Sequence, residues 1–217
     1  MSLMNIPEIE YDQFLKDLLN GDKPKCVEYV RGLLDNGIQL KTLYLELFQR
    51  SLYDTGTLWE HHEISVATEH MVTAIVESLM VLGYATLFEG PLKRDKVIVS
   101  CTANEIHQVG GKMVADICEF KGWSAFFTGA DTPLNDLLRL IEEQRPMCIA
   151  LSLSIYFNLN PLLDAVDKLK ERFPSIPLLV GGQAFLHGGT DKINSITGVE
   201  YVPTLDALEL KLAEYSK

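Results

Sequence analysis

The stretch Val97-Ile98-Val99-Ser100-Cys101 has the composition of a short buried strand, and Asn104-Glu105-Ile106-His107-Gln108-Val109-Gly110 follows it closely. Apolar residues at helical spacing come next: Met113, Val114, Ile117 and Cys118. We therefore expect His107 at the end of a strand and the start of a helix, where open α/β sheets bind ligands. A hydrogen-bonded loop histidine would give the same local pattern, so the rest of the chain has to decide between the two interpretations.

From residue 95 onward, short apolar segments alternate with amphipathic ones. We expect strands at 97–101, 124–127, 147–152, 177–180 and 199–202. Helices are expected at about 108–121, 134–144, 159–173 and 204–215, with an unassigned piece after Gly182. Strands separated by helices of this length form βαβ units. The sequence thus predicts an α/β domain over 95–217 with a five-stranded parallel sheet, flavodoxin-like or Rossmann-like.

The first part of the chain has only the helical period. Apolar faces predict helices at 7–21, 24–36, about 40–55 and about 66–83, which together form a four-helix bundle over residues 4–88. The polar segment Thr55–Ser65 is expected to join the last two helices, with Ser65 as an N-cap. A segment with Gly, Pro and charged residues, Phe88–Asp95, is the predicted domain boundary.

Composition limits the function classes. The chain has 217 residues, 47% of them hydrophobic, and a net charge of −11. Residues 1–92 hold 14 acidic and 6 basic side chains, which disfavours a direct grip on nucleic acid. No uninterrupted apolar run reaches the roughly 18 residues of a membrane span, and no signal peptide is evident, so we expect a cytoplasmic protein. The four cysteines are widely spaced, and no two of them form a CxxC pair. We therefore expect them to be buried reduced thiols.

Unusual polar and small residues follow three of the predicted strands. They are Glu105 to Gly110, Ser152 to Ser154 and Gly181-Gly182. The carboxyl ends of parallel strands share one edge of the sheet, so these segments should be neighbours. His107 offers a metal an imidazole nitrogen, and Glu105 can hold the other ring nitrogen. Gly110 and Gly111 would let a large group approach the helix start.

Spacing makes a resemblance specific. Glu105-x-His107-x-x-Gly110, then 41 residues, Ser152-x-Ser154, then 26 residues, and Gly181-Gly182 resembles the signature of cobalamin-binding domains. The resemblance implies that His107 is the lower axial ligand of cobalt and Glu105 its supporting partner. Cofactor contacts are implied for Gln108, Gly110, Ser152, Ser154, Gly181 and Gly182. Most members have Asp where this chain has Glu105, and Leu is common where it has Ser154.

The helical part is similar to the cap of light-sensing MerR-type repressors that bind adenosylcobalamin. The similarity lies in Trp59 followed by Glu69-His70, which implies that these residues cover the upper face of the cofactor. Thr128-Gly129-Ala130-Asp131-Thr132-Pro133 also matches those proteins. One departure is Glu60, where they have a histidine that can reach cobalt.

Two histidines, His61 and His62, follow Glu60, and whether either substitutes for that ligand is left open. The DNA-binding helix-turn-helix of those repressors has no counterpart in this sequence. Any output is therefore expected to pass through a protein partner or a homo-oligomer, without direct nucleic-acid or membrane binding.

Three other functions fit less well. A receiver domain would need clustered acidic residues after the first strand, where this chain has Ser100-Cys101-Thr102. A dinucleotide-binding domain would need a GxGxxG turn there, and a serine hydrolase would need glycines around Ser152. Two cobalamin functions stay open: a sensor module holding adenosylcobalamin, which we favour, and a carrier holding methylcobalamin for separate methyltransferases. In both, the cofactor and not the polypeptide carries the bond chemistry.

Overall fold

The structure is a computed structural model that describes residues 6–84 and 95–216. The chain divides into two compact units, within residues 1–86 and 87–217, and each unit is described by itself. The predicted boundary segment, 88–95, lies outside the described residues apart from Asp95.

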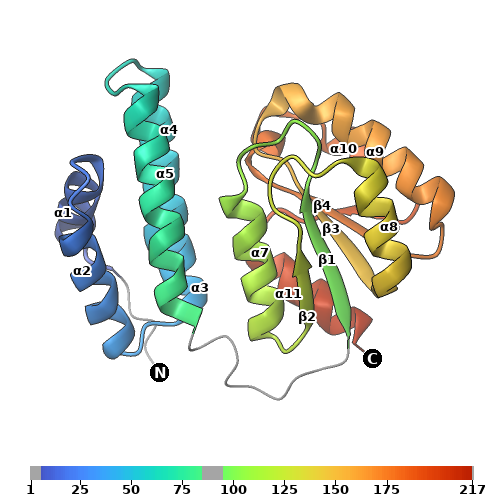
Figure 1. The fold of residues 1–217 in the computed structure, drawn as a ribbon, viewed down its shortest axis with the longest axis horizontal. Helices are drawn as coiled ribbons and strands as arrows, with labels where there is room; N and C mark the ends of the chain where they lie inside the picture. Colours follow the sequence, from blue (N-terminus) through green and yellow to red (C-terminus); the bar gives the residue numbers. More distant parts are fainter. Residues whose placement is uncertain (1–5, 85–94, 217) are drawn as a thin grey trace. The chain divides into compact units, whose positions relative to one another are not determined.

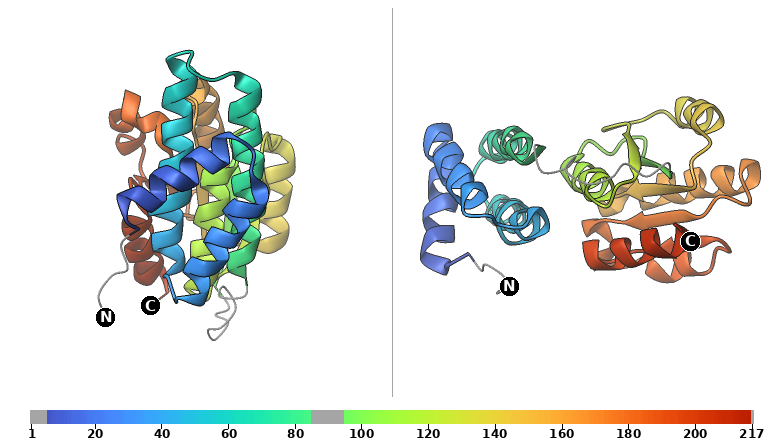
Figure 2. Two further views of the ribbon diagram at one scale, coloured as in Figure 1. Left: turned by 90° about the vertical axis from the view of Figure 1, so that its left-hand side faces the viewer. Right: turned by 90° about the horizontal axis from the view of Figure 1, so that it is seen from below.

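The helical unit begins with α1 (Glu8–Leu19) and α2 (Lys23–Asp35). A continuous helix follows over 40–60, built from α3 (Leu40–Thr42), a π-helical segment (Leu43–Gln49) and α4 (Arg50–Glu60). The last helix, α5 (Val66–Met80), ends in a 3₁₀ turn (Val81–Gly83). Figure 2 shows α1 and α2 as one layer and the 40–60 helix with α5 as the other, which confirms the predicted bundle.

Apolar side chains from all the helices fill the core of this unit. Those exposed by 2% or less include Tyr11, Phe14, Leu18, Val30, Leu43, Tyr44, Leu47, Phe48, Val72, Ile75, Val76 and Leu79. The Tyr11 hydroxyl is buried among them and donates a hydrogen bond to the Asp54 carboxylate, which ties α1 to α4. The Arg50 guanidinium lies 3.6 Å from the centre of the Tyr11 ring.

The third helix is longer than the sequence predicts. Thr55–Glu60 is helical and not part of a loop, so the connection to α5 is limited to residues 61–65. Thr55 is 1% exposed, and its hydroxyl donates a 2.6 Å hydrogen bond to the Ser51 carbonyl. This side chain packs inward, and the helix continues beyond it to Glu60, two residues before the left-handed His62, whose φ is 60°. Trp59 consequently lies in the last turn of α4.

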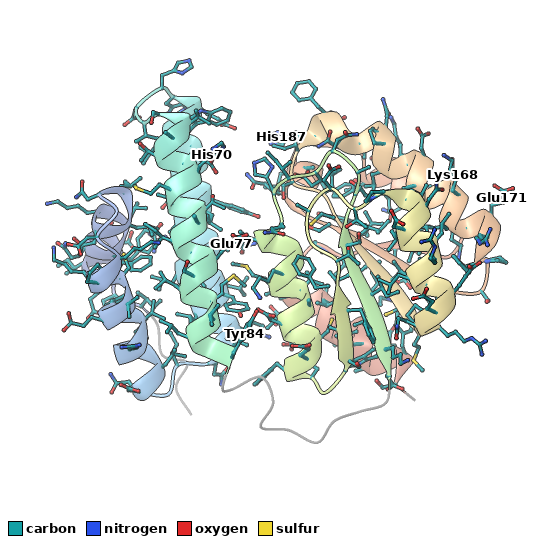
Figure 3. The ribbon with its side chains drawn as sticks, viewed as in Figure 1. His70, Glu77, Tyr84, Lys168, Glu171 and His187 are labelled. Atoms are coloured by element: carbon teal, nitrogen blue, oxygen red, sulfur yellow. The ribbon has the colours of Figure 1, made fainter. Side chains whose placement is uncertain are left out.

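The start of α5 agrees with the prediction, because the Ser65 side chain accepts a hydrogen bond from the Thr68 N–H. The sequence has no uninterrupted apolar run as long as a membrane span, but average hydropathy over a window is a less strict criterion. By length and composition alone, Val66–Gly83 is the one helix among the described residues that is long and apolar enough to cross a membrane. Buried helices of a protein core pass the same test, and one face of α5 lies in the bundle core. Figure 3 shows His70 and Glu77 along this helix and Tyr84 just after its 3₁₀ turn.

The sheet unit contains five parallel strands in the order β2-β1-β3-β4-β5. Their bounds are β1 (Lys96–Cys101), β2 (Ser124–Phe127), β3 (Cys148–Ser152), β4 (Leu178–Gly181) and β5 (Val199–Tyr201). Each lies within one residue of its expected bounds. The predicted α/β sheet is therefore confirmed, and β1, β3 and β4 form its centre.

Helices cover both faces of the sheet, and Figure 1 shows α7 (Val109–Phe120) and α8 (Leu134–Gln144) on opposite sides of β1. α9 (Leu159–Arg172) shares a core cluster with α8 that includes Ile98, Ile149, Leu151 and Val180. α11 (Leu205–Tyr215) contacts α7. The piece left unassigned after Gly182 forms a 3₁₀ segment (Gln183–His187) and α10 (Thr190–Asn194).

All four cysteines are buried and unbridged, as expected. Burial raises the pKa of the Cys101 thiol to about 12 and that of Cys148 to about 12. Cys101, Cys118 and Cys148 are core residues of the sheet and its helices, and Cys26 is a core residue of α2 in the helical unit.

Candidate functional site

Three loops meet at the carboxyl edge of the central strands. Cys101 lies opposite Ser152 in the register of β1 and β3, and Ser152 lies opposite Gly181 in the register of β3 and β4. The loops that leave these three residues therefore start side by side. The edge predicted from the sequence is the edge at which the candidate residues gather.

The centre of this edge is a contact between Glu105 and His107. Oε1 of the carboxylate lies 2.9 Å from Nδ1 of the imidazole and accepts a second 2.9 Å hydrogen bond from the His107 main-chain N–H. A carboxylate on Nδ1 favours the tautomer with its proton on that nitrogen, which leaves Nε2 unprotonated and more basic, as a metal ligand needs to be. The arrangement is that of a metal-binding histidine with its carboxylate support.

The other oxygen of Glu105 is held by the neighbouring loop. Oε2 accepts 2.9 Å hydrogen bonds from the main-chain N–H groups of Ser154 and Ile155. Burial opposes ionisation of this fully buried side chain, but the hydrogen bonds from His107, Ile155 and Ser154 outweigh it and lower the Glu105 pKa. Glu105 is thus a buried anion that joins the loop after β1 to the loop after β3.

His107 itself is accessible, since 38% of its side chain is exposed. Among the described residues, no three His, Cys, Asp or Glu side chains gather as a metal site made of protein ligands alone. A metal held here would need most of its ligands from elsewhere. The corrin ring of cobalamin supplies such ligands around its cobalt, so one supported imidazole suits this cofactor.

The start of α7 has room beside this edge. A Cβ atom added at Gly110 would meet only Ser152 Oγ, at 3.7 Å, whereas one at Gly111 would lie 3.1 Å from Cys101 Sγ and 3.2 Å from Phe127 Cε2. Gly111 therefore serves close packing of α7 on the sheet, and Gly110 faces the more open side. Ser152 is only 6% exposed and lies next to this glycine pair.

Gly181 and Gly182, at the end of β4, are constrained by the backbone that surrounds them. A Cβ atom at Gly181 would lie 2.6 Å from the Val202 carbonyl oxygen, and one at Gly182 would lie 2.1 Å from the Leu153 carbonyl oxygen. Gly182 also has a φ of 119°, which favours glycine. Both glycines are required by the fold whether or not they also contact a ligand.

Two other predicted residues act through atoms that sequence reasoning did not single out. Gln108 directly precedes α7, and its Oε1 accepts a 3.2 Å hydrogen bond from the Ala130 N–H in the loop after β2. Ser154, chosen for its hydroxyl, contributes its main-chain N–H to Glu105. Because nearly every residue has a main-chain N–H, such a donor cannot be identified from the residue type.

The candidates in the helical unit lie at the adjoining ends of α4 and α5. Trp59 is 45% exposed. The Glu69 carboxylate accepts a 3.1 Å hydrogen bond from the Thr73 hydroxyl, and its Oε2 is 3.6 Å from Nε2 of the exposed His70.

The polar residues next to Trp59 are exposed too: Glu60 ends α4, and His61 and His62 follow it. Nδ1 of His61 is 3.8 Å from the Glu63 carboxylate. Trp59, Glu69 and His70 therefore occupy one end of the bundle, with their polar atoms or ring surface accessible.

His187 is exposed in the 3₁₀ segment after β4 (Figure 3). Its ring lies edge-on to Tyr156, with the ring centres 6.5 Å apart.

Two family models match the chain, and both describe a B12 binding domain. One covers residues 95–190, within the sheet unit, and the other covers residues 10–82, within the helical unit. Together they span both units and all the candidate residues.

Relatives of known function fall into two groups. The chain is 28% identical over 165 residues to the HTH-type transcriptional repressor CarH of Myxococcus xanthus, covering 75% of this chain and 54% of the repressor. It is 26% identical over 147 residues to dimethylamine corrinoid protein 3 of Methanosarcina acetivorans, covering 66% of each. The chain thus spans about half to two thirds of the length of these relatives.

The fold is shared with solved corrinoid proteins. The monomethylamine corrinoid protein of Methanosarcina barkeri superposes with a TM-score of 0.79 at 15% identity, covering 93% of this chain and 96% of that one. The methanol:cobalamin methyltransferase complex MtaBC of the same organism gives a TM-score of 0.52 at 15% identity, covering 98% and 81%. These matches establish the architecture of a helical unit followed by a sheet unit.

Proposed function

Because the chain belongs to the B12-binding domain family, with a family model matching each of its two units, we propose that its sheet unit holds cobalamin with His107 as the lower axial ligand of cobalt. The observation that carries the proposal is the Glu105–His107 contact at the carboxyl edge of β1. When bound, cobalamin supplies the cobalt–carbon chemistry. The protein contributes ligation, access and docking.

Glu105 orients the ligand. By accepting a hydrogen bond from Nδ1–H, it would hold the imidazole in the tautomer whose Nε2 can bind a metal, and its negative charge would strengthen donation from that nitrogen. The amides of Ser154 and Ile155 keep the carboxylate ionised in a buried place. Ligation by His107 leaves no room on that side of cobalt for the cofactor's own base, so we propose that the nucleotide tail is displaced.

The displaced tail would pass the small residues of the edge. Gly110 presents no side chain, and Ser152 offers a hydroxyl beside it. Gly181 and Gly182 end the neighbouring strand β4, where they allow close approach of the Val202 and Leu153 carbonyls. Support for this route comes from these residues and from the family signature that they match.

The proposal is tested by reconstituting the protein with cobalamin and recording visible spectra of His107→Ala and His187→Ala. We expect loss of histidine ligation in the first variant and an unchanged spectrum in the second, which removes an exposed histidine of the same unit. An unaltered spectrum in His107→Ala would exclude this residue as the ligand.

The finer proposal is a sensor or regulatory module that holds adenosylcobalamin, with the helical unit covering the upper face. Its support is the exposed Trp59 at the end of α4, the Glu69–His70 pair at the start of α5, and the relationship to the repressor CarH. Release or photolysis of the upper ligand would then change self-association or a contact with a protein partner.

A corrinoid methyl carrier for separate methyltransferases is the second candidate, because dimethylamine and trimethylamine corrinoid proteins are also relatives. Reconstitution with adenosylcobalamin in the dark, followed by illumination, separates the two. A change in assembly on illumination supports the sensor. Unchanged assembly, together with methyl transfer from methylcobalamin to a thiol acceptor when a corrinoid methyltransferase is added, supports the carrier.

A further inference from the structure

Asn104, the residue before Glu105, has a left-handed backbone with a φ of 69°. Side chains from two other loops hold it there. Its N–H donates a 2.7 Å hydrogen bond to Asp131 Oδ1, and its carbonyl accepts a 3.0 Å hydrogen bond from Asn158 Nδ2. Asparagine tolerates this conformation better than most residues, and the two contacts fix the residue at both its N–H and its carbonyl.

Asp131 contacts the same loop a second time. Its own N–H donates a 2.9 Å hydrogen bond to the Glu105 carbonyl, and its φ of 46° is also left-handed. The loop after β2 therefore holds the main chain on both sides of the Asn104–Glu105 peptide. Because Glu105 and Asn104 are adjacent, a change in direction at Asn104 would move the buried carboxylate.

The loop after β3 is fastened at both ends to the loop that contains His107. Its beginning, the amides of Ser154 and Ile155, binds the Glu105 carboxylate, and its end, Asn158, binds the Asn104 carbonyl. The three loops thus form one hydrogen-bonded network, in which the Asp131 and Asn158 side chains, like those of Glu105 and Gln108, reach from one loop to another.

We propose that Asp131 and Asn158 are positioning residues for the lower ligand: they fix the chain at Asn104 so that Glu105 can hold both the His107 imidazole and the 154–155 amides. The inference rests on the proposed function, because it assigns these residues a part in setting how much of the bound cobalt is histidine-ligated. Both residues bind the main chain at Asn104 or Glu105. Their effect is transmitted through the backbone.

The chain offers matched variants. Asp131→Gly removes the carboxylate and tolerates the left-handed φ, whereas Asp131→Asn keeps an acceptor oxygen at the same place. Asn158→Ala removes the amide donor. Asn160→Ala removes the same side chain two residues later, from an exposed position on α9.

Two readouts are needed, one on the protein alone and one on the cobalamin-bound form. In the protein alone, amide hydrogen exchange at Ser154 and Ile155 should accelerate about two- to tenfold in Asp131→Gly and Asn158→Ala, as expected for loss of one hydrogen bond. In the bound form, the same variants should show a smaller histidine-ligated fraction in the visible spectrum. Asp131→Asn and Asn160→Ala should match the wild type in both.

The outcomes are distinguishable. An unchanged histidine-ligated fraction in Asp131→Gly and Asn158→Ala, beside a ligated wild type, would overturn the positioning role even if exchange accelerates. Equal losses in Asn160→Ala would overturn it too. A wild type without histidine ligation would instead contradict the proposed function on which the role depends.

Discussion

The carboxylate of Glu105 lies 2.9 Å from Nδ1 of His107 and also accepts a hydrogen bond from the main-chain N–H of that histidine. One buried anion therefore fixes both the ring and the backbone of the candidate ligand. Since the same carboxylate holds the next loop, orientation of the imidazole and stability of the sheet edge depend on a single side chain.

Glu105→Gln should weaken both the orientation of the His107 imidazole and the stability of the sheet edge. An amide group has one acceptor oxygen, so at least one pair of donors among His107 and the 154–155 amides would face an NH₂ group. We expect a loss of about 1–3 kcal/mol in the free energy of unfolding without cofactor. Urea unfolding monitored by circular dichroism measures it. Unchanged stability would contradict the geometry, and Glu63→Gln, at an exposed carboxylate of the helical unit, is the control.

Two glycines near the edge should respond in opposite ways. Gly182→Ala would bring a Cβ atom to 2.1 Å from a main-chain carbonyl at a φ of 119°, so it should destabilise the protein by about 3 kcal/mol. Gly110→Ala meets nothing closer than 3.7 Å and lies in a helix, where alanine is favoured by up to about 1 kcal/mol. Thermal unfolding of the two variants compares them. Similar losses would show that the packing at Gly110 is tighter than described.

The helical unit should lose stability at alkaline pH through Tyr11. Burial, and then the hydrogen bond to Asp54, raise the pKa of this phenol far above its ordinary value of 10.0. The folded protein therefore keeps the Tyr11 proton where the unfolded chain releases it. The stabilisation is complete below pH 10 and decreases as pH rises above that value.

Tyr11→Phe removes this titration. The variant should be about 1 kcal/mol less stable at neutral pH, because Asp54 loses a partner, and its stability should fall less steeply above pH 10. Urea unfolding between pH 8 and pH 11 gives both values. Parallel curves for the wild type and the variant would assign the alkaline loss to other tyrosines.

Trp59→Ala distinguishes an adenosyl pocket from a general apolar surface. Because about half of the Trp59 side chain is buried, the substitution should lower the free energy of unfolding of the protein alone by about 1–3 kcal/mol. Its affinity for adenosylcobalamin should fall more than its affinity for methylcobalamin, as measured by titration calorimetry in the dark. Equal losses for the two cofactors would count against an adenosyl pocket at this residue.

Periodicity and composition were sufficient for the architecture, because strands such as Val97–Cys101 are continuous apolar runs and the helices have one apolar face. The end of the third helix was predicted too early, because Thr55 and Gly56 resemble turn residues. The structure shows that Thr55 packs inward and that the helix continues beyond it. At the site, the spacing of Glu105 and His107 identified the contact that the structure shows.

The sequence did not reveal the supports of that contact. The amides of Ser154 and Ile155 are main-chain atoms common to nearly all residues, and the left-handed turn at Asn104 depends on Asp131 and Asn158, far away in sequence. Such contacts come from the convergence of loops at one sheet edge, which only the three-dimensional fold specifies.

The most direct measurement of the central claim is electron paramagnetic resonance of bound cob(II)alamin in protein labelled with ¹⁵N at histidine. If His107 is the lower ligand, the splitting of each cobalt line should change from the triplet of ¹⁴N to the doublet of ¹⁵N, and should be lost in His107→Ala. A triplet that persists in the labelled protein would show that the base of cobalamin itself binds cobalt, and would contradict the claim.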